Sequence, residues 1–278
     1  MPIRLLHFSD IHFGGENGLA LEAATAFAAI APCDLIVVSG DITQYGRSDE
    51  FALATAWLER LHGPVLCVPG NHDTPWMNLW ERVVAPFSRY ARAIGPASAT
   101  SFASPGLAVY GLNSARGWQI RLNWSKGSIS PRQVHRARRY FQAAETSSLR
   151  ILVCHHPLVE FIGEPMTARV RGGRFAARKL AEAKVDLILT GHLHAPFVQT
   201  LSFGDAKTVA IGAGTLSLRE RGDPPSFSVL DIEADYVRVT NMAWDGLAFG
   251  PSQEWVSHLR ERPPVSDPTT IVPNDIDF

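Results

Sequence analysis

Short apolar runs alternate with helical patterns through the first two thirds of the chain. Each run is nearly continuous rather than alternating, which is typical of a strand buried on both faces of a sheet. Apolar residues at helical spacing lie between the runs, and the connections are short. This order predicts βαβ units and a mostly parallel sheet, so the predicted fold class is α/β. The predicted strands are residues 3–8, 34–38, 65–68, 149–154 and 185–190, and the predicted helices are residues 18–31, 48–61 and 131–144, with another that ends near residue 183.

The rest of the chain follows a different pattern. Residues 75–92 have partial helical character, and a hairpin is expected around residues 104–106. In the last third, residues 207–211, 226–232 and 236–242 are predicted strands joined by short turns, which favours an antiparallel set.

Proline and polar residues dominate the sequence after residue 250. No linker divides the chain before that point. We therefore expect one folded domain at residues 1–250, followed by a Pro-rich tail at residues 251–278 that is extended or loosely ordered.

Composition excludes some classes of protein. The chain has 278 residues, of which 46% are hydrophobic and 19% are charged, and this suits one sizeable core. Its 26 basic and 27 acidic residues nearly cancel, so no long nucleic acid is expected as a partner. No apolar run approaches the ~20 residues that a membrane span needs, and the first strand leaves no room for a signal peptide. We therefore expect a cytoplasmic protein with no membrane partner and with reduced, buried Cys33, Cys67 and Cys154.

Polar side chains directly follow five of the predicted strands. The turn Gly70-Asn71-His72-Asp73 is the densest of these clusters, although by itself it could equally be a solvated turn. Because the carboxyl ends of parallel strands lie along one edge of a sheet, where ligands bind, five coincident clusters are hard to assign to chance. Six of the ten histidines lie at these strand ends, when His156 is counted beside His155. The clusters are Asp10 and His12, Asp41, Asn71 and His72, His155, and His192 and His194.

The chemistry of these side chains indicates metal ions. Imidazole and carboxylate groups without thiolate suit zinc, manganese, iron, cobalt or nickel, and argue against an iron–sulfur cluster. Seven candidate ligands are too many for one ion, but they suit two ions that share one carboxylate. Two ions about 3.5–4 Å apart can clamp an in-line displacement and lower the pKa of a bound water. With two aspartates and a bridging hydroxide, two divalent ions leave a small positive surplus, which favours a phosphate ester without choosing between monoester and diester.

In order along the chain, these clusters resemble the five motif blocks of the calcineurin-like metallophosphoesterases. The matching sequences are Asp10-x-His12, Gly40-Asp41, Gly70-Asn71-His72-Asp73, His155-x-Pro157 and Gly191-His192-x-His194. The resemblance covers about residues 3–215, and within the superfamily it is strongest to the class III cyclic-nucleotide and glycerophosphodiester phosphodiesterases. It implies a four-layer α/β/β/α sandwich with two mixed β-sheets, in which residues 1–250 form the catalytic domain.

The resemblance also implies a role for each residue. One ion would be held by Asp10, His12 and His194 with Asp41 bridging, and the second by Asp41, Asn71, His155 and His192. His72 would contact the phosphate and protonate the leaving alkoxide, with Asp73 orienting its ring, while the extra His156 would have a supporting role. A metal-bridging hydroxide would attack a small phosphodiester, such as a cyclic nucleotide or a glycerophosphodiester. The cofactors would be two divalent or mixed-valence ions of Mn, Fe, Zn, Co or Ni.

Other interpretations stay open. A phosphomonoesterase or a broad-specificity phosphoesterase would use the same ligands, whereas a non-catalytic protein-interaction scaffold would be expected to have lost some of them. The Arg/Trp segment at residues 116–126 and the Arg-rich loop at residues 169–174 could contact a phosphate, stack on a base or simply be solvated. In this family such segments also form lids or dimer contacts, so a homo-oligomer is possible. The substrate-binding residues are left unassigned.

Overall fold

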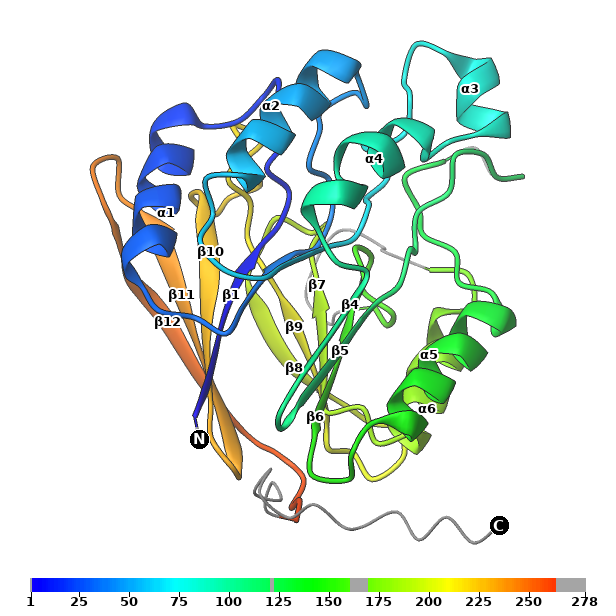
Figure 1. Cartoon of the computed structure of the whole chain (residues 1–278), viewed down its shortest axis with the longest axis vertical. Coiled ribbons are helices and arrows are strands. Elements are labelled where there is room, and N and C mark those ends of the chain that lie inside the picture. The colour runs from blue at the N-terminus through cyan, green and yellow to red at the C-terminus, as the bar shows by residue number, and fades with distance from the viewer. Residues whose placement is uncertain (1, 121–122, 161–169, 264–278) are drawn as a thin grey trace, which may run out of the picture.

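Two six-stranded β-sheets packed face to face form the centre of the molecule (Figure 1). The computed structural model describes residues 2–120, 123–160 and 170–263. The strand order is β12-β11-β10-β1-β2-β3 in the first sheet and β4-β5-β6-β7-β9-β8 in the second. The strands are β1 (Ile3–Phe8), β2 (Leu35–Val38), β3 (Val65–Cys67), β4 (Ser101–Ser104), β5 (Leu107–Gly111), β6 (Leu149–Val153), β7 (Leu187–Thr190), β8 (Phe197–Leu201), β9 (Thr208–Gly212), β10 (Ser226–Ile232), β11 (Tyr236–Trp244) and β12 (Phe249–His258).

Helices cover the outer face of each sheet. α1 and α2 pack on the first sheet, and α5 and α6 pack on the second (Figure 1). The predicted four-layer α/β/β/α sandwich with two mixed sheets is therefore confirmed. Within the described residues, no helix has the length and apolar character needed to cross a bilayer. The helices are α1 (Gly18–Ile30), α2 (Ser48–Leu58), α3 (Leu79–Val84), α4 (Ser88–Ala93), the 3-10 turn η1 (Gly95–Ala97), α5 (Pro131–Ala143) and α6 (Gly173–Glu182).

Burial on both faces explains the continuous apolar strands. In β2, Leu35 and Val37 belong to the core between the two sheets. Ile36 and Val38 belong instead to the core under α1 and α2. The strands β1, β2 and β3 are parallel, and Phe8 is level with Val38, so the polar residues after each strand begin at the same edge.

The last third of the chain divides between the sheets, and this differs in part from the expectation. Strands β10, β11 and β12 form an antiparallel set in the first sheet. Strand β9 joins the second sheet instead, parallel to β7. Strand β8, which the sequence did not predict, pairs antiparallel with β9 at the sheet edge. Its middle is only partly buried, so its apolar pattern is weak.

The domain boundary that we expected at residue 250 is wrong, because it falls inside β12. This strand pairs along its length with β11 at the edge of the first sheet. Its side chains are mostly exposed, so pairing rather than an apolar pattern defines it. Pro251 is tolerated because the strand lies at an edge and its register shifts beside that residue. Residues 264–278 of the expected tail lie outside the described residues.

Candidate metal centre

The carboxyl ends of two sets of parallel strands meet at one edge of the sandwich. β1, β2 and β3 end there in the first sheet, and β6 and β7 end there in the second. Asp10 Oδ1, from the first sheet, lies 3.1 Å from His194 Nε2 of the second. Asp41 Oδ2 lies 3.2 Å from His155 Nε2 in the same way. All seven candidate ligands are buried.

One group consists of Asp10, His12 and His194. His12 Nε2 is 3.4 Å from His194 Nε2 and 3.8 Å from Asp10 Oδ1. The other oxygen, Asp10 Oδ2, accepts hydrogen bonds from Ser9 Oγ at 2.6 Å and from the His192 N–H at 2.8 Å. Burial alone would raise the pKa of Asp10, but the nearby His194 outweighs it and lowers the pKa. The carboxylate is therefore ionised and fixed, with Oδ1 turned toward the two histidines.

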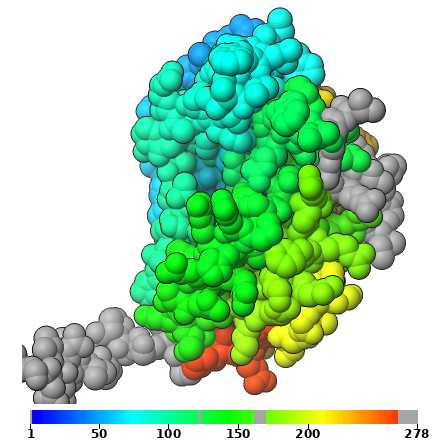
Figure 2. Space-filling model, turned by 90° about the vertical axis from the view of Figure 1, so that its right-hand side faces the viewer, coloured from blue at the N-terminus to red at the C-terminus, as the bar shows by residue number. Residues whose placement is uncertain are grey.

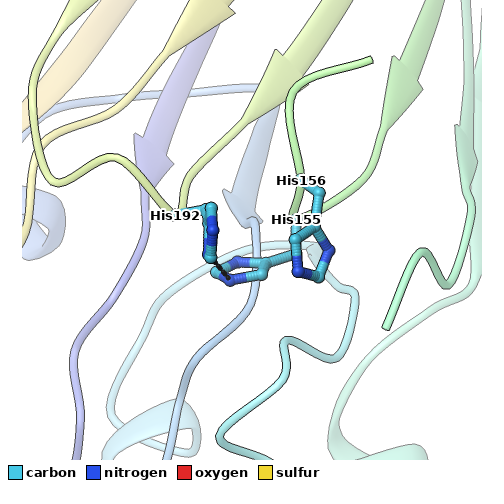
Figure 3. A group of neighbouring side chains, drawn as sticks. All are labelled: His155, His156 and His192. Carbon is cyan, nitrogen blue, oxygen red and sulfur yellow. Dashed lines mark hydrogen bonds between the residues drawn. The ribbon is translucent and has the colours of Figure 1, made fainter. Parts of the chain in front are cut away.

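A second group surrounds Asp41. Its Oδ2 lies between the two groups, because it is 3.2 Å from His155 Nε2 and 3.9 Å from His12 Nε2. Its Oδ1 accepts the His72 N–H at 2.8 Å. His192 completes this group, with Nδ1 3.3 Å from His155 Nε2 (Figure 3). A carboxylate in this position can be shared by two ions.

In His155 and His194, Nδ1 is hydrogen-bonded to a backbone carbonyl, and Nε2 faces a carboxylate oxygen. His155 Nδ1 lies 2.9 Å from the Ser39 carbonyl, and His194 Nδ1 lies 2.8 Å from the Arg219 carbonyl, so both Nδ1 atoms donate. When such a ring is neutral, the lone pair is on Nε2 and points at a carboxylate oxygen, which is repulsive unless a proton or a metal ion lies between them. Burial lowers the pKa of His155, but Asp41 outweighs it and raises the pKa to about 9. The arrangement thus attracts positive charge.

Two buried oxygens in this region also lack a donor. Among the described residues, neither Asp10 Oδ1 nor Asn71 Oδ1 has a hydrogen-bond partner. Buried acceptors are rarely left unsatisfied, and bound divalent ions would satisfy these two oxygens. Imidazole, carboxylate and amide oxygen are also a donor set that first-row metals accept. The His and Asp groups of this centre could therefore hold metal ions.

Most of the candidate ligands have a left-handed backbone. Residues other than glycine rarely adopt positive φ, at a cost of order 1–3 kcal/mol each, and such strain collects at functional sites. Here it occurs in the first turn after the strands and directs the ligands to one edge. The φ angles are 52° at Asp10, 54° at His12, 49° at Asp41, 73° at His192 and 63° at His194.

Two glycines allow the strand ends to pack this closely. A Cβ atom on Gly70 would lie 2.1 Å from Asp41 Oδ1. A Cβ atom on Gly191 would lie 1.8 Å from Ser9 Oγ and 2.5 Å from Asp10 Oδ2. Any larger residue at either position would therefore displace a candidate metal ligand.

His72 lies beside the centre, but Asp73 does not orient its ring as we predicted. His72 Nδ1 is 2.7 Å from the Gln44 carbonyl, and His72 Nε2 is 3.1 Å from Nη1 of Arg219. The Asp73 carboxylate instead accepts the N–H and the hydroxyl of Thr43, each at 2.8 Å. That prediction is wrong because neighbouring side chains in the turn point in different directions. Burial, with a contribution from Asp41, raises the pKa of Asp73 to about 6.

A pocket of about 580 Å³ adjoins His72. One wall comes from the segment around α3, and the other comes from the segment after β5, which lies beside it in Figures 1 and 2. The buried guanidinium of Arg82 lies 5.9 Å from the ring centre of Trp76 and 5.5 Å from that of Trp124. The pocket thus has aromatic walls and one buried cation. Its lining residues are Asn71, His72, Trp76, Leu79, Arg82, Asn123, Trp124 and Ser125.

A family model of the calcineurin-like phosphoesterases matches residues 3–196. This chain is a calcineurin-like phosphoesterase. It is therefore a hydrolase that acts on phosphoesters, and the family resemblance predicted from the motif blocks is confirmed.

Two curated relatives of this phosphoesterase are named as phosphodiesterases. A probable cyclic nucleotide phosphodiesterase of Synechococcus sp. is 27% identical over 259 residues, which cover 84% of this chain and 89% of that protein. A glycerophosphodiester phosphodiesterase of Enterobacter lignolyticus is 36% identical over 80 residues, which cover 25% of this chain and 29% of that protein. The first match extends over nearly the whole length of its relative, whereas the second is local.

Solved structures support the fold of the phosphoesterase. A purple acid phosphatase from yellow lupin seeds superposes with a TM-score of 0.60 at 12% identity over 92% of this chain. The phosphoesterase spans about half of that protein, 53% of its length. The protein TT1561 of Thermus thermophilus gives a TM-score of 0.59 at 15% identity, with 83% of this chain and 95% of that chain covered. At these identities the likeness concerns the fold alone.

The ring of His156 lies next to those of His155 and His192 in the phosphoesterase (Figure 3). Its Nε2 lies 2.7 Å from the Ser125 carbonyl, and its Nδ1 lies 2.8 Å from Ser114 Oγ. Burial lowers the pKa of His156 to about 3, so the ring is neutral, donates from Nε2 and accepts at Nδ1. It thereby ties the loop that carries Trp124 to the end of β6, next to His155.

The two Arg-containing segments of the phosphoesterase contribute less than their composition indicated. Arg116 donates to Gln133 of α5 at 2.7 Å. Trp124 does line the pocket, as a stacking face would. Arg121 and Arg169 lie outside the described residues.

Two arginines that the sequence did not single out reach the centre from the turn after β9. Arg219 contacts His72, and Arg221 Nη1 donates to the His192 carbonyl at 3.2 Å. The turn belongs to no motif block, and Arg219 is 147 residues from His72 in the sequence. Only the folded chain reveals their position.

Proposed function

We propose that this phosphoesterase is a dinuclear metal-dependent phosphodiesterase that hydrolyses a small phosphodiester, such as a cyclic nucleotide or a glycerophosphodiester. The observation that carries the proposal is the position of Asp41 Oδ2 between two groups of ligands, 3.2 Å from His155 Nε2 and 3.9 Å from His12 Nε2. The names of the two curated relatives support the choice of a diester.

The ligands divide into two sets that share Asp41. Asp10, His12 and His194 would hold one ion with Asp41, and Asn71, His155 and His192 would hold the other with the same carboxylate. When bound, two such ions supply Lewis acidity and lower the pKa of a water. The identity of the ions, among Mn, Fe, Zn, Co and Ni, is left open by this donor set.

His72 would supply the proton of the reaction. As a water oxygen bonds to phosphorus, the bond from phosphorus to the alkoxide breaks, and the departing oxygen takes a proton. The Gln44 carbonyl fixes His72 Nδ1 at 2.7 Å, so Nε2, which contacts Arg219 at 3.1 Å, is the nitrogen that would face the leaving group. The pocket beside His72 would take the organic part of the leaving group, and its volume of about 580 Å³ suits a small molecule.

The test is a comparison of two chromogenic esters with the manganese-loaded protein. Bis(p-nitrophenyl) phosphate should be hydrolysed with a higher kcat/KM than p-nitrophenyl phosphate. The reverse preference would favour the alternative, a phosphomonoesterase, and hydrolysis of neither ester would favour a non-catalytic scaffold. A screen of cyclic nucleotides, glycerophosphodiesters and nucleotide monoesters would then identify the substrate class.

A further inference from the structure

A chain of hydrogen bonds fixes the turn after β9 to the metal edge, by which we mean the edge of the sandwich that carries the seven candidate ligands. Thr215 Oγ1 donates to the Asp10 carbonyl at 2.7 Å and lies 2.7 Å from Ser217 Oγ. Ser217 Oγ accepts the Arg219 N–H at 3.2 Å, and the Arg219 carbonyl accepts from His194 Nδ1 at 2.8 Å. The backbone of Arg219 is thus tied at two points to candidate metal ligands or their neighbours.

The side chain of Arg219 is exposed and ends over His72. Nη1 lies 3.1 Å from His72 Nε2. A guanidinium is always protonated, so it donates and Nε2 accepts. No carboxylate within residues 2–120, 123–160 and 170–263 forms an ion pair with Arg219. Arg219 therefore places a positive charge beside His72, next to the site.

We propose that Arg219 binds a phosphoryl oxygen of the substrate, and that it favours dianionic over monoanionic phosphoryl groups. This inference rests on the proposed function for the place of the phosphoryl group. An arginine fork matches two phosphate oxygens better than it matches one imidazole nitrogen, so an incoming phosphoryl group displaces His72 as its partner. Binding of the anion thereby uncovers Nε2, the atom that faces the leaving group.

The charge of the ligand decides how much Arg219 contributes. Coulomb attraction scales with the product of the charges, so at equal distance a dianion gains about twice as much as a monoanion. Phosphomonoesters are dianions above their second pKa of about 6, and orthophosphate is mainly a dianion at pH 8, whereas a phosphodiester carries a single charge. Arg219 therefore sets the relative affinity of the site for two kinds of ligand: the monoanionic diester substrate, and a dianionic ligand such as a monoester or orthophosphate.

The experiment measures orthophosphate binding to the manganese-loaded full chain by calorimetry at pH 8. In Arg219→Gln, phosphate should bind about 10- to 100-fold more weakly, because one charge-assisted contact is lost. Binding of dimethyl phosphate, a monoanion, measured in the same way, should weaken by only about 3- to 10-fold. Arg219→Lys, which keeps the charge without the fork, should lie between wild type and Arg219→Gln. Arg238→Gln removes the same charge from an exposed position in strand β11, where Arg238 pairs with Glu254 at 3.6 Å, and should leave both affinities unchanged.

The outcomes separate this inference from the proposed function. Phosphate affinity within twofold of wild type in Arg219→Gln overturns the inference, even if the protein is an active diesterase. Equal losses for phosphate and dimethyl phosphate also overturn it, because they remove the charge discrimination. Loss of bound manganese in Arg219→Gln overturns it as well, since the substitution keeps the backbone carbonyl that holds His194. If phosphate binding depends on Arg219 but no phosphoester is hydrolysed, the inference stands and the phosphodiesterase proposal fails.

Discussion

The metal edge and the pocket beside it are built in opposite ways. At the metal edge, Asp10 and His12 are completely buried, and their backbones are locked by strand pairing and left-handed turns. At the pocket, Trp76 is 56% exposed and stands just before the short helix α3, and Trp124 stands in a loop. A few side-chain contacts, chiefly those of Arg82, hold the pocket walls together.

This difference separates chemistry from substrate choice. Groups that must keep their geometry sit on the rigid ends of strands, where a small displacement would be costly. Groups that contact the variable part of a substrate sit on loops, which tolerate change. His156 connects the two regions, since its ring holds the Trp124 loop next to His155.

The strongest test of the rigid region is Asp41→Asn. If Asp41 is shared by two ions, this change should remove bound metal and lower kcat/KM by at least about 10³-fold, because both ions lose a charged ligand. Metal content by mass spectrometry and hydrolysis of bis(p-nitrophenyl) phosphate measure the two effects. Asp49→Asn, at an exposed position in α2, is the matched control. Retention of two ions per chain in Asp41→Asn would refute the shared carboxylate.

His72→Ala tests the boundary between the two regions. It should keep its metal and lose about 10²- to 10³-fold in kcat on alkyl esters, since a poor leaving group needs a proton. On aryl esters, whose leaving groups need little help, the loss should be much smaller. A comparison of kcat for an alkyl and an aryl diester gives the answer, and equal losses would argue against proton donation by His72.

Gly70→Ala tests whether the metal edge is too tightly packed to accept an added methyl group. The new Cβ would lie 2.1 Å from Asp41 Oδ1, so activity should fall by about 10²-fold and stability by roughly 1–3 kcal/mol. Gly95→Ala adds the same methyl group where no atom lies within 4 Å, and should be near neutral. Thermal melting and kcat/KM of the pair decide the point. Equal behaviour of the two variants would mean that the edge is adaptable.

The smallest effect is expected in the pocket. Trp124→Ala should raise KM for aromatic diesters by about 10-fold, because a stacked aromatic contact contributes about 1–3 kcal/mol. Metal content and kcat should hardly change. Trp118→Ala, in the same segment but outside the lining, is the control. A fall in metal content in Trp124→Ala would show that the pocket and the metal edge are not independent.

Most of the metal edge could be predicted from sequence because strand ends in a parallel sheet meet by topology. The apolar run Leu35–Val38 predicts a strand, and Asp41, which follows shortly after it, is then expected at the edge of the sheet. The structure brings the candidate ligands together, while their division between two ions stays a prediction. The predicted contact between Asp73 and His72 was wrong, because adjacency in sequence says little about where two side chains point in a turn.

The pocket and Arg219 could not be predicted, for the same physical reason. Trp76, Trp124 and Arg219 lie in segments without a regular period, so nothing in the sequence specifies which loops meet. Strand β12 was missed because its exposed side chains carry no apolar pattern, and hydrogen bonding with β11 alone defines it.

The left-handed backbone of the candidate ligands also limits which residues can replace them. Asn and Gly accept positive φ most readily, whereas β-branched residues do not. In a library selected only for soluble, folded protein, Asn and Gly should therefore accumulate at positions 10, 12, 41, 192 and 194. His155, which has an ordinary φ and is equally buried, should show no such bias. The pattern of tolerated residues would thus record the shape of the backbone separately from the chemistry of the ligands.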